Sequence, residues 1–188
     1  MDHRDALGRD AHPGSPGTAY WVTGLPGVGK KTLAQTLASR ITASGRPVIR
    51  LDGDRLREVL GGRFGYGQAD RHTVAQVYAR LCRELTAQGP DVILATVSMF
   101  HDVRRWSRAN IERYCEIYLR ASVDMLAARH PKGLYAAALA GRIRNVPGVD
   151  LPIEEPDTPD IVIDDDGSKT PAAVALELFR RLRLAEAA

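Results

Sequence analysis

Cysteines, aromatic residues and long apolar runs are all scarce in this chain of 188 residues. Its two cysteines, Cys82 and Cys115, have neither the number nor the spacing of a metal site or a disulfide framework, so we expect buried thiols in a reducing compartment. No apolar run is long enough to span a bilayer, and no charged-then-apolar signal opens the chain. These absences favour a cytoplasmic protein.

Neither sign of charge dominates the composition. There are 26 Lys and Arg residues against 23 Asp and Glu residues, which gives a net charge of +3, and the two signs are interspersed. Surfaces that bind nucleic acid usually concentrate basic residues and place aromatic residues among them, whereas aromatic residues make up only 6% of this chain. The charge pattern therefore predicts an anionic small molecule as partner, and neither nucleic acid nor a membrane.

Short apolar runs alternate with helical patterns along most of the chain. Residues 1–17 lack periodicity and are expected to be a disordered leader before a single domain at 18–188. Strands are expected at residues 19–23, 47–51, 91–97, 114–119 and 161–163. Helices are expected at residues 31–44, 70–88, 103–113 and 123–129, and from a Thr170 cap to about residue 184. The helix at 70–88 is expected to bury Val74, Val77, Leu81 and Leu85 on one face. This order predicts a three-layer α/β/α fold with a mainly parallel five-stranded sheet.

Residues 24–32 read G-L-P-G-V-G-K-K-T, a glycine-rich loop between a predicted strand and a predicted helix. The phosphate-loop pattern G-x-x-x-x-G-K-[ST] fits through Lys30, but Lys31 stands where a hydroxyl should ligate Mg²⁺. Backbone amides of such a loop and the N-terminus of the following helix bind phosphate oxygens. ATP is therefore expected to contact the contiguous residues Gly24, Leu25, Pro26, Gly27, Val28, Gly29, Lys30, Lys31 and Thr32.

A basic segment punctuated by glycine and proline extends over residues 129–150. Between residues 129 and 149 it carries Arg129, Lys132, Arg142 and Arg144 and no acidic residue. A segment of this kind beside a nucleotide site predicts a mobile lid that closes over phosphates. A solvated surface helix is the alternative interpretation.

Six motifs in the same order resemble the adenylyl-sulfate kinase family. After the phosphate loop come L-D-G-D-R-L-R at 51–57, G-Y-G-Q-A-D-R at 65–71, V-S-M-F at 97–100, P-K-G-L-Y at 131–135 with A-G-R-I at 140–143, and an acidic proline turn at 152–156. The resemblance covers residues 18 to about 165. It implies a P-loop NTPase-type fold, ATP and Mg²⁺ as cofactors, and transfer of the γ-phosphoryl group to the ribose 3′-hydroxyl of adenosine phosphosulfate. The family is commonly dimeric, so a homodimer is one assembly that it allows.

The resemblance implies roles for individual residues. Asp54, at the end of a predicted strand, is the candidate catalytic base or metal organiser, with helix capping as the alternative for it and for Asp52. Lys30 and Ser98 complete the catalytic set, Ser98 first as a substrate contact. Arg129 is expected at ATP. Two arginines suit an anionic acceptor, and one aromatic residue suits stacking on its base. The residues expected to contact the acceptor are Asp52, Arg57, Tyr66, Arg71, Ser98, Phe100, Lys132 and Val146.

The departures from the family pattern fall on ligand-facing positions. Lys31 replaces the metal-binding hydroxyl, Val74 an Asn amide, Met99 a proline, and Val146 the second aromatic of a base sandwich. Losing one stacking face should cost about 1–3 kcal/mol. We therefore expect an ATP-dependent kinase that acts on adenosine phosphosulfate or, in preference, on a related nucleotide-like anion. A non-catalytic nucleotide-binding relic and a kinase of an unrelated metabolite or antibiotic are the alternatives.

Overall fold

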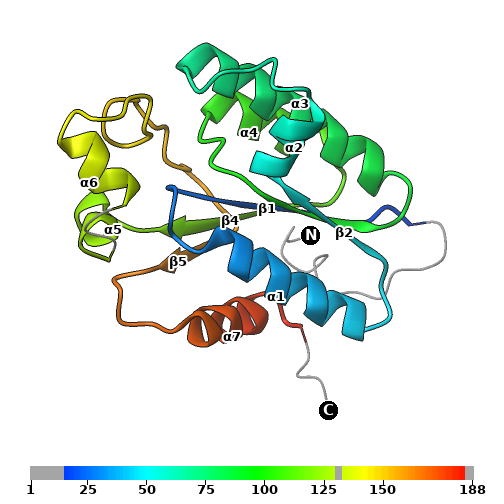
Figure 1. The fold of residues 1–188 in the computed structure, drawn as a ribbon. Helices are drawn as coiled ribbons and strands as arrows, with labels where there is room; N and C mark the ends of the chain where they lie inside the picture. The colour runs from blue at the N-terminus through cyan, green and yellow to red at the C-terminus, as the bar shows by residue number, and fades with distance from the viewer. Residues whose placement is uncertain (1–14, 130–132, 185–188) are drawn as a thin grey trace.

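Five parallel strands form the centre of the molecule. The structure is a computed structural model that describes residues 15–129 and 133–184 (Figure 1). The strands lie in the order β2-β3-β1-β4-β5 and all neighbours are parallel. Their bounds are Ala19–Gly24 for β1, Val48–Asp52 for β2, Asp91–Ala95 for β3, Tyr114–Arg120 for β4 and Ile161–Asp164 for β5. The predicted fold class is confirmed, and each predicted strand corresponds to one of these.

Helices cover both faces of the sheet. They are α1 at Lys30–Ala43, α2 at Gly53–Val59, α3 at Gln68–Thr86, α4 at His101–Asn110, α5 at Val123–Arg129, α6 at Leu134–Leu139 and α7 at Pro171–Arg181. Helices α1 and α7 lie on one face, and α3 and α4 lie on the other (Figure 1). Helix α2 was expected only through the capping alternative for Asp52 and Asp54, because seven residues are too few for a periodic signal. None of the described helices is long and apolar enough to cross a membrane.

Alternation along the central strands divides the core in two. On β1, Tyr20 and Val22 belong to the cluster under α1 and α7, whereas Ala19 and Trp21 belong to the cluster under α3 and α4. Successive side chains of a strand point to opposite faces, so a strand covered on both sides is apolar at every position. All six residues of β1 are buried, which explains why this strand could be recognised from its sequence.

Helix α3 turns a different face to the core from the one expected. The sequence pattern suggested Val74, Val77, Leu81 and Leu85 as the buried stripe. Val74 is buried, but Val77, Leu81 and Leu85 are only half-buried. The buried face consists of Val74, Ala75, Tyr78, Ala79, Cys82 and Thr86. Small side chains let this helix approach the sheet closely, and the larger apolar residues lie at the edge of the contact.

The folded part begins slightly before the predicted domain boundary. Residues 1–14 of the expected leader lie outside the described residues. The Gly17 amide donates a 2.8 Å hydrogen bond to the Thr86 carbonyl at the end of α3. A Cβ added at Gly17 would lie 1.9 Å from the Pro90 carbonyl oxygen, so this position admits only glycine. Gly17 therefore belongs to the domain and not to the leader.

Candidate active site

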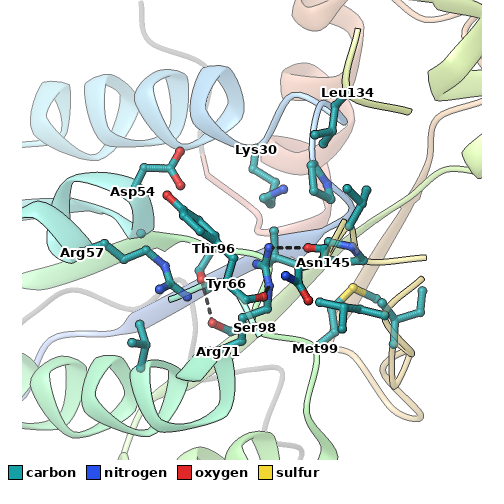
Figure 2. A pocket seen from close by; sticks show the side chains of 18 of the residues that line it. Lys30, Asp54, Arg57, Tyr66, Arg71, Thr96, Ser98, Met99, Leu134 and Asn145 are labelled. Atoms are coloured by element: carbon teal, nitrogen blue, oxygen red, sulfur yellow. Dashed lines mark hydrogen bonds between the residues drawn. The ribbon is translucent and has the colours of Figure 1, made fainter. Parts of the chain in front are cut away.

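A wide cavity opens at the carboxyl ends of β1, β2 and β3. It has a volume of about 750 Å³ and is lined by the phosphate loop after β1, by Asp54 after β2 and by Ser98 after β3. Figure 2 shows side chains from these separate segments reaching into the same space. Open α/β sheets bind ligands at this edge, because the loops that follow parallel strands all gather there. The cavity is large enough for a nucleotide-sized ligand.

Backbone geometry explains the glycines of the phosphate loop. Gly29 precedes α1 with φ at 93°, a left-handed conformation that side chains disfavour. At Gly24 an added Cβ would lie 2.4 Å from the Leu119 carbonyl oxygen. The loop can therefore keep its amides turned toward a ligand only if these positions remain glycine.

The Lys30 side chain folds back over this loop. Its Nζ donates to the carbonyl oxygens of Gly24 at 2.9 Å and Leu25 at 2.8 Å. Burial lowers the pKa of Lys30 to about 7, and the neighbouring Asp54 carboxylate only partly offsets the effect of burial. The Lys30 amine is therefore only partly protonated near neutral pH, and the charge of a phosphate group would favour its ammonium form.

Lys31 makes a bridge between two aspartates, which we call the loop triad (Lys31, Asp52 and Asp54). The Lys31 Nζ lies 2.8 Å from Asp54 Oδ2 and 3.1 Å from Asp52 Oδ2. Hydrogen bonding to Asp54 raises the pKa of Lys31 against a small effect of desolvation. Partial burial acts to raise the pKa of Asp52, but hydrogen bonds from Lys31 and from two backbone amides outweigh it and lower this pKa.

Asp52 and Asp54 have different local roles. Asp52 is the N-cap of α2, where its Oδ1 accepts from the amides of Asp54 at 2.9 Å and Arg55 at 3.4 Å. The capping alternative is therefore confirmed for Asp52, and its expected acceptor contact stays a prediction. Asp54 lines the large cavity and keeps an exposed carboxylate. Its expected catalytic role also stays a prediction, now with a position that suits it.

The side chains around the triad do not fit a metal ion held directly by the protein. Among residues 15–129 and 133–184 there is no group of three or more His, Cys, Asp or Glu residues that could hold a metal. Lys31 offers only N–H donors, and a metal needs lone pairs from its ligands. The Oδ2 atoms of Asp52 and Asp54 already face the Lys31 ammonium. The metal role expected of Asp54 would require this pairing to open.

Two arginines and Tyr66 form a second group on the cavity wall. The guanidinium carbons of Arg57 and Arg71 lie 5.0 and 5.4 Å from the centre of the Tyr66 ring. Arg71 donates to the Tyr66 carbonyl at 2.8 Å and to the Asn145 carbonyl at 3.1 Å. Arg57 donates to the Gly65 carbonyl at 2.7 Å. Tyr66 is 58% exposed, so its ring is available to a ligand beside two fixed positive charges.

Three of the departures from the family pattern lie in the lining of this cavity. Val74, Met99 and Val146 all line it and all are buried. Phe100 also lines the cavity and meets the His72 ring edge-on at 5.1 Å between centroids. The structure thus brings Tyr66 and Val146 to one pocket, as expected, and the aliphatic Val146 stands where the resemblance implies a second aromatic.

Two hydroxyl groups, that of Thr96 after β3 and that of Tyr78 in the middle of α3, were not predicted from the sequence. Ser98 Oγ lies 2.7 Å from Thr96 Oγ1, and both residues are buried in the cavity wall. The Tyr78 hydroxyl donates to the Gly53 carbonyl at 2.5 Å and so fixes the start of α2. Thr96 could have been found from its position two residues before Ser98. Tyr78 gave no such signal, because its partner lies 25 residues away.

The segment expected to be a lid contacts the phosphate loop. The Tyr135 hydroxyl on α6 donates to the Pro26 carbonyl at 3.0 Å. Arg129 reaches the Asp165 carboxylate at 2.9 Å and lines a smaller cavity of about 290 Å³ together with Val28 and Thr32. Lys132 lies outside the described residues. Closure of the segment over a ligand stays a prediction.

Comparisons with known proteins agree with this geometry. The family model for adenylylsulphate kinase matches residues 16–164. An adenylyl-sulfate kinase from Myxococcus xanthus is 37% identical over 180 residues, covering 93% of this chain and 97% of its own. Cytidine diphosphoramidate kinase from Campylobacter jejuni is 39% identical over 143 residues, covering 76% of this chain and 83% of its own.

A solved structure resembles the whole described fold. The Mycobacterium tuberculosis APS kinase in complex with AMPPNP and APS matches with a TM-score of 0.78 and 28% identity, covering 90% of this chain and 99% of its own. The family model spans most of the chain, and the curated relatives exceed a third identity over most of their lengths. The chain therefore belongs to the adenylylsulphate kinase family.

Proposed function

We propose that the protein is a kinase that transfers the γ-phosphoryl group of ATP to the ribose 3′-hydroxyl of a nucleotide-like anion. One observation carries the proposal: a single cavity joins the phosphate-loop lysine, Lys30, to the Tyr66 group with its two arginines. Asp54 and Ser98 line the space between these ends. Phosphoryl transfer needs mainly this kind of positioning and charge stabilisation, because the protein has little covalent chemistry to perform.

Each group of cavity residues has a separate role in the proposed reaction. Loop amides and Lys30 hold the triphosphate, and the Lys30 amine becomes fully protonated when phosphate binds. Asp54 accepts a hydrogen bond from the acceptor hydroxyl and orients it toward the γ-phosphorus. Arg57 and Arg71 bind the anionic part of the acceptor, and Tyr66 stacks on its base. The contact of Tyr135 with Pro26 places α6 where it can exclude water.

The adenosine part of ATP is assigned to the smaller cavity. That cavity adjoins the phosphate loop through Val28, Gly29 and Thr32 and continues to Arg129. Thr32 faces this side, one residue further along α1 from Lys31, so it cannot replace the missing hydroxyl at position 31. ATP would thus span the two cavities, with its γ-phosphate directed into the larger one.

The acceptor is proposed to be a nucleotide other than adenosine phosphosulfate. Val146 and Val74 give the base pocket apolar walls where an aromatic ring and an amide would hold adenine. One relative in the family carries the name cytidine diphosphoramidate kinase, at 39% identity, so members with names for different nucleotide acceptors have similar sequences. A cytidine diphosphate derivative is therefore the first acceptor to try.

The test is acceptor-dependent release of ADP. Purified protein receives ATP, Mg²⁺ and, separately, adenosine phosphosulfate, cytidine and uridine diphosphate derivatives, and neutral sugars. We expect turnover with a nucleotide diphosphate derivative to exceed turnover with adenosine phosphosulfate. Tyr66→Ala should raise the KM for that acceptor about tenfold, whereas the control Tyr66→Phe should keep it within about twofold.

Two outcomes would overturn the proposal. Tight ATP binding without turnover on any acceptor would support a nucleotide-binding relic, for which the bridging of Asp54 by Lys31 is the favouring observation. Efficient phosphorylation of a neutral sugar would support a kinase of an unrelated metabolite. Neither result is compatible with Arg57, Tyr66 and Arg71 serving as an anionic-nucleotide site.

A further inference from the structure

The position after the phosphate-loop lysine holds a cation in this chain. In the usual phosphate loop, this residue carries the hydroxyl that ligates Mg²⁺. Here it is Lys31, the second residue of α1, and its ammonium lies 2.8 Å from Asp54 Oδ2 and 3.1 Å from Asp52 Oδ2. The change therefore does more than remove a ligand, since it places a positive charge against the two nearest carboxylates.

One of the two remaining carboxylate oxygens is already engaged. Asp52 Oδ1 is occupied by the amides that begin α2, at 2.9 Å from Asp54 N and 3.4 Å from Arg55 N. Moving Asp52 toward a metal would leave these helix-start amides without their cap. A divalent ion at the triad would also lie next to the Lys31 ammonium and be repelled by it. A Mg²⁺ ion held by both carboxylates therefore has to displace the cap or the lysine, and one held by Asp54 Oδ1 alone would lie beside the Lys31 ammonium.

We propose that the Lys31 ammonium is the resident cation of the phosphate site. It neutralises the Asp52–Asp54 pair permanently, so that ATP binds without a bond between the protein and a metal. Any Mg²⁺ that accompanies ATP is then held by the nucleotide and water. This inference deepens the proposed function but rests on it only as far as ATP binding, because it makes no claim about the acceptor or about turnover.

The charges around the loop are balanced without a metal. The Lys31 ammonium faces the two carboxylates, and Lys30 adds a second positive charge when it gains a proton beside a phosphate group. Without Lys31, two carboxylates would face an incoming triphosphate with only the buried Lys30 to offset them. A metal would then be needed to screen this repulsion, as in loops that carry Ser or Thr. Lys31 screens this repulsion with a positive charge that is part of α1 itself.

The test compares nucleotide affinity with and without metal. The dissociation constant of AMPPNP is measured calorimetrically for the full chain in excess EDTA and in millimolar Mg²⁺. For the unaltered protein we expect the two constants to agree within about threefold. For Lys31→Thr, which restores the hydroxyl, we expect Mg²⁺ to tighten binding by tenfold or more. Lys31→Arg keeps the charge and should behave like the unaltered protein.

A control variant removes another exposed cation that belongs to an ion pair. Arg83 lies at the far end of α3 and pairs with Glu84. Arg83→Met should leave both dissociation constants unchanged, whereas Lys31→Met should weaken metal-free binding by about tenfold. This pair of variants separates a local effect of Lys31 from a general effect of net charge.

The result that overturns the inference needs no variant. If Mg²⁺ tightens AMPPNP binding to the unaltered protein by tenfold or more, Lys31 does not act as the resident cation. Failure to bind AMPPNP under either condition would also overturn it. Metal-independent binding without turnover on any acceptor would refute the proposed function and leave this inference supported, so the two failures are distinguishable.

Discussion

Two clusters of charged side chains differ in their surroundings far more than in their composition. The loop triad at the cavity is open to solvent, with the side chains of Lys31 and Asp54 59% and 70% exposed. The second cluster, which we call the sheet cluster, lies between β4 and α4 and consists of Arg104, Arg108, Glu116 and Asp160. Its central members Arg104 and Glu116 are only 6% and 4% exposed.

The difference in burial separates a functional role from a structural one. Exposed ion pairs contribute little to stability, so the pair of Lys31 with Asp54 is not needed to hold the fold together. Buried pairs are different, because removing one partner leaves the other without compensation. Glu116 faces Arg104 at 3.3 Å and Arg108 at 3.6 Å, and its amide donates to Asp160 at 2.8 Å. Burial raises the pKa of Glu116 to about 7, while the two arginines act in the opposite direction.

The largest effect on activity should come from a change in the loop triad. Asp54→Asn keeps the size of the side chain but removes the charge that orients the acceptor hydroxyl, so we expect kcat to fall by about 10³-fold. The midpoint of thermal unfolding should hardly change, because the side chain is exposed. ADP release and a thermal melt measure the two quantities. If Asp54→Asn kept more than a tenth of the activity, Asp54 would not be the group that orients the acceptor hydroxyl. Glu84→Gln removes the charge of another exposed carboxylate and serves as the control.

A change in the sheet cluster should lower stability and leave activity nearly unchanged. Glu116→Ala leaves two guanidinium groups without their buried partner, so the free energy of unfolding should fall by about 3–5 kcal/mol. Urea denaturation monitors this loss, and kcat measured well below the unfolding transition should stay within about twofold. A loss of stability below about 1 kcal/mol, or a selective loss of kcat, would remove the contrast between the two clusters.

The affinity of the cavity for ATP should depend on pH through the protonation of Lys30. Its pKa is lowered to about 7, mainly by burial, and phosphate groups should raise it again on binding. A site that gains a proton on binding loses affinity as pH rises, so ATP affinity should fall about tenfold between pH 7.5 and 9. Calorimetry in two buffers of different ionisation enthalpy should show uptake of about one proton at pH 8.5. Binding without proton uptake would mean that Lys30 is already charged in the free protein.

The smallest effect is expected at Ser98. Its hydroxyl is paired with Thr96 and lines the cavity, and direct transfer between ATP and acceptor does not require it as a nucleophile. Ser98→Ala should therefore lower kcat less than about tenfold and raise the acceptor KM modestly. Complete loss of turnover, together with phosphate found on Ser98 of the unaltered protein, would instead indicate a covalent intermediate. Thr96→Val provides the comparison for loss of the hydrogen bond alone.

Much of the fold could be predicted because its signals are local. The strands are continuous apolar runs, and their observed bounds differ from the expected ones by two residues or fewer. Helix α7 begins at its predicted Thr170 cap, whose Oγ1 accepts from the Ala173 amide at 3.2 Å. The buried face of α3 could not be predicted correctly, because close approach to the sheet selected alanines over larger apolar residues. Helix α2 depends on the Asp52 cap and the Tyr78 contact, and the second of these is a tertiary interaction.

The sequence by itself determined the phosphate loop, the parallel α/β fold and the family, because each depends on residues close together in the chain. It also identified Lys31 as a substitution at a metal-binding position. Only the tertiary structure decided what Lys31 does there. Parallel pairing of β2 beside β3 brings the end of β2 to the same edge as the loop, and this places Asp52 and Asp54 against an ammonium more than twenty residues earlier in the chain. Contacts between separate strand ends depend on how the sheet assembles, and no local pattern encodes them.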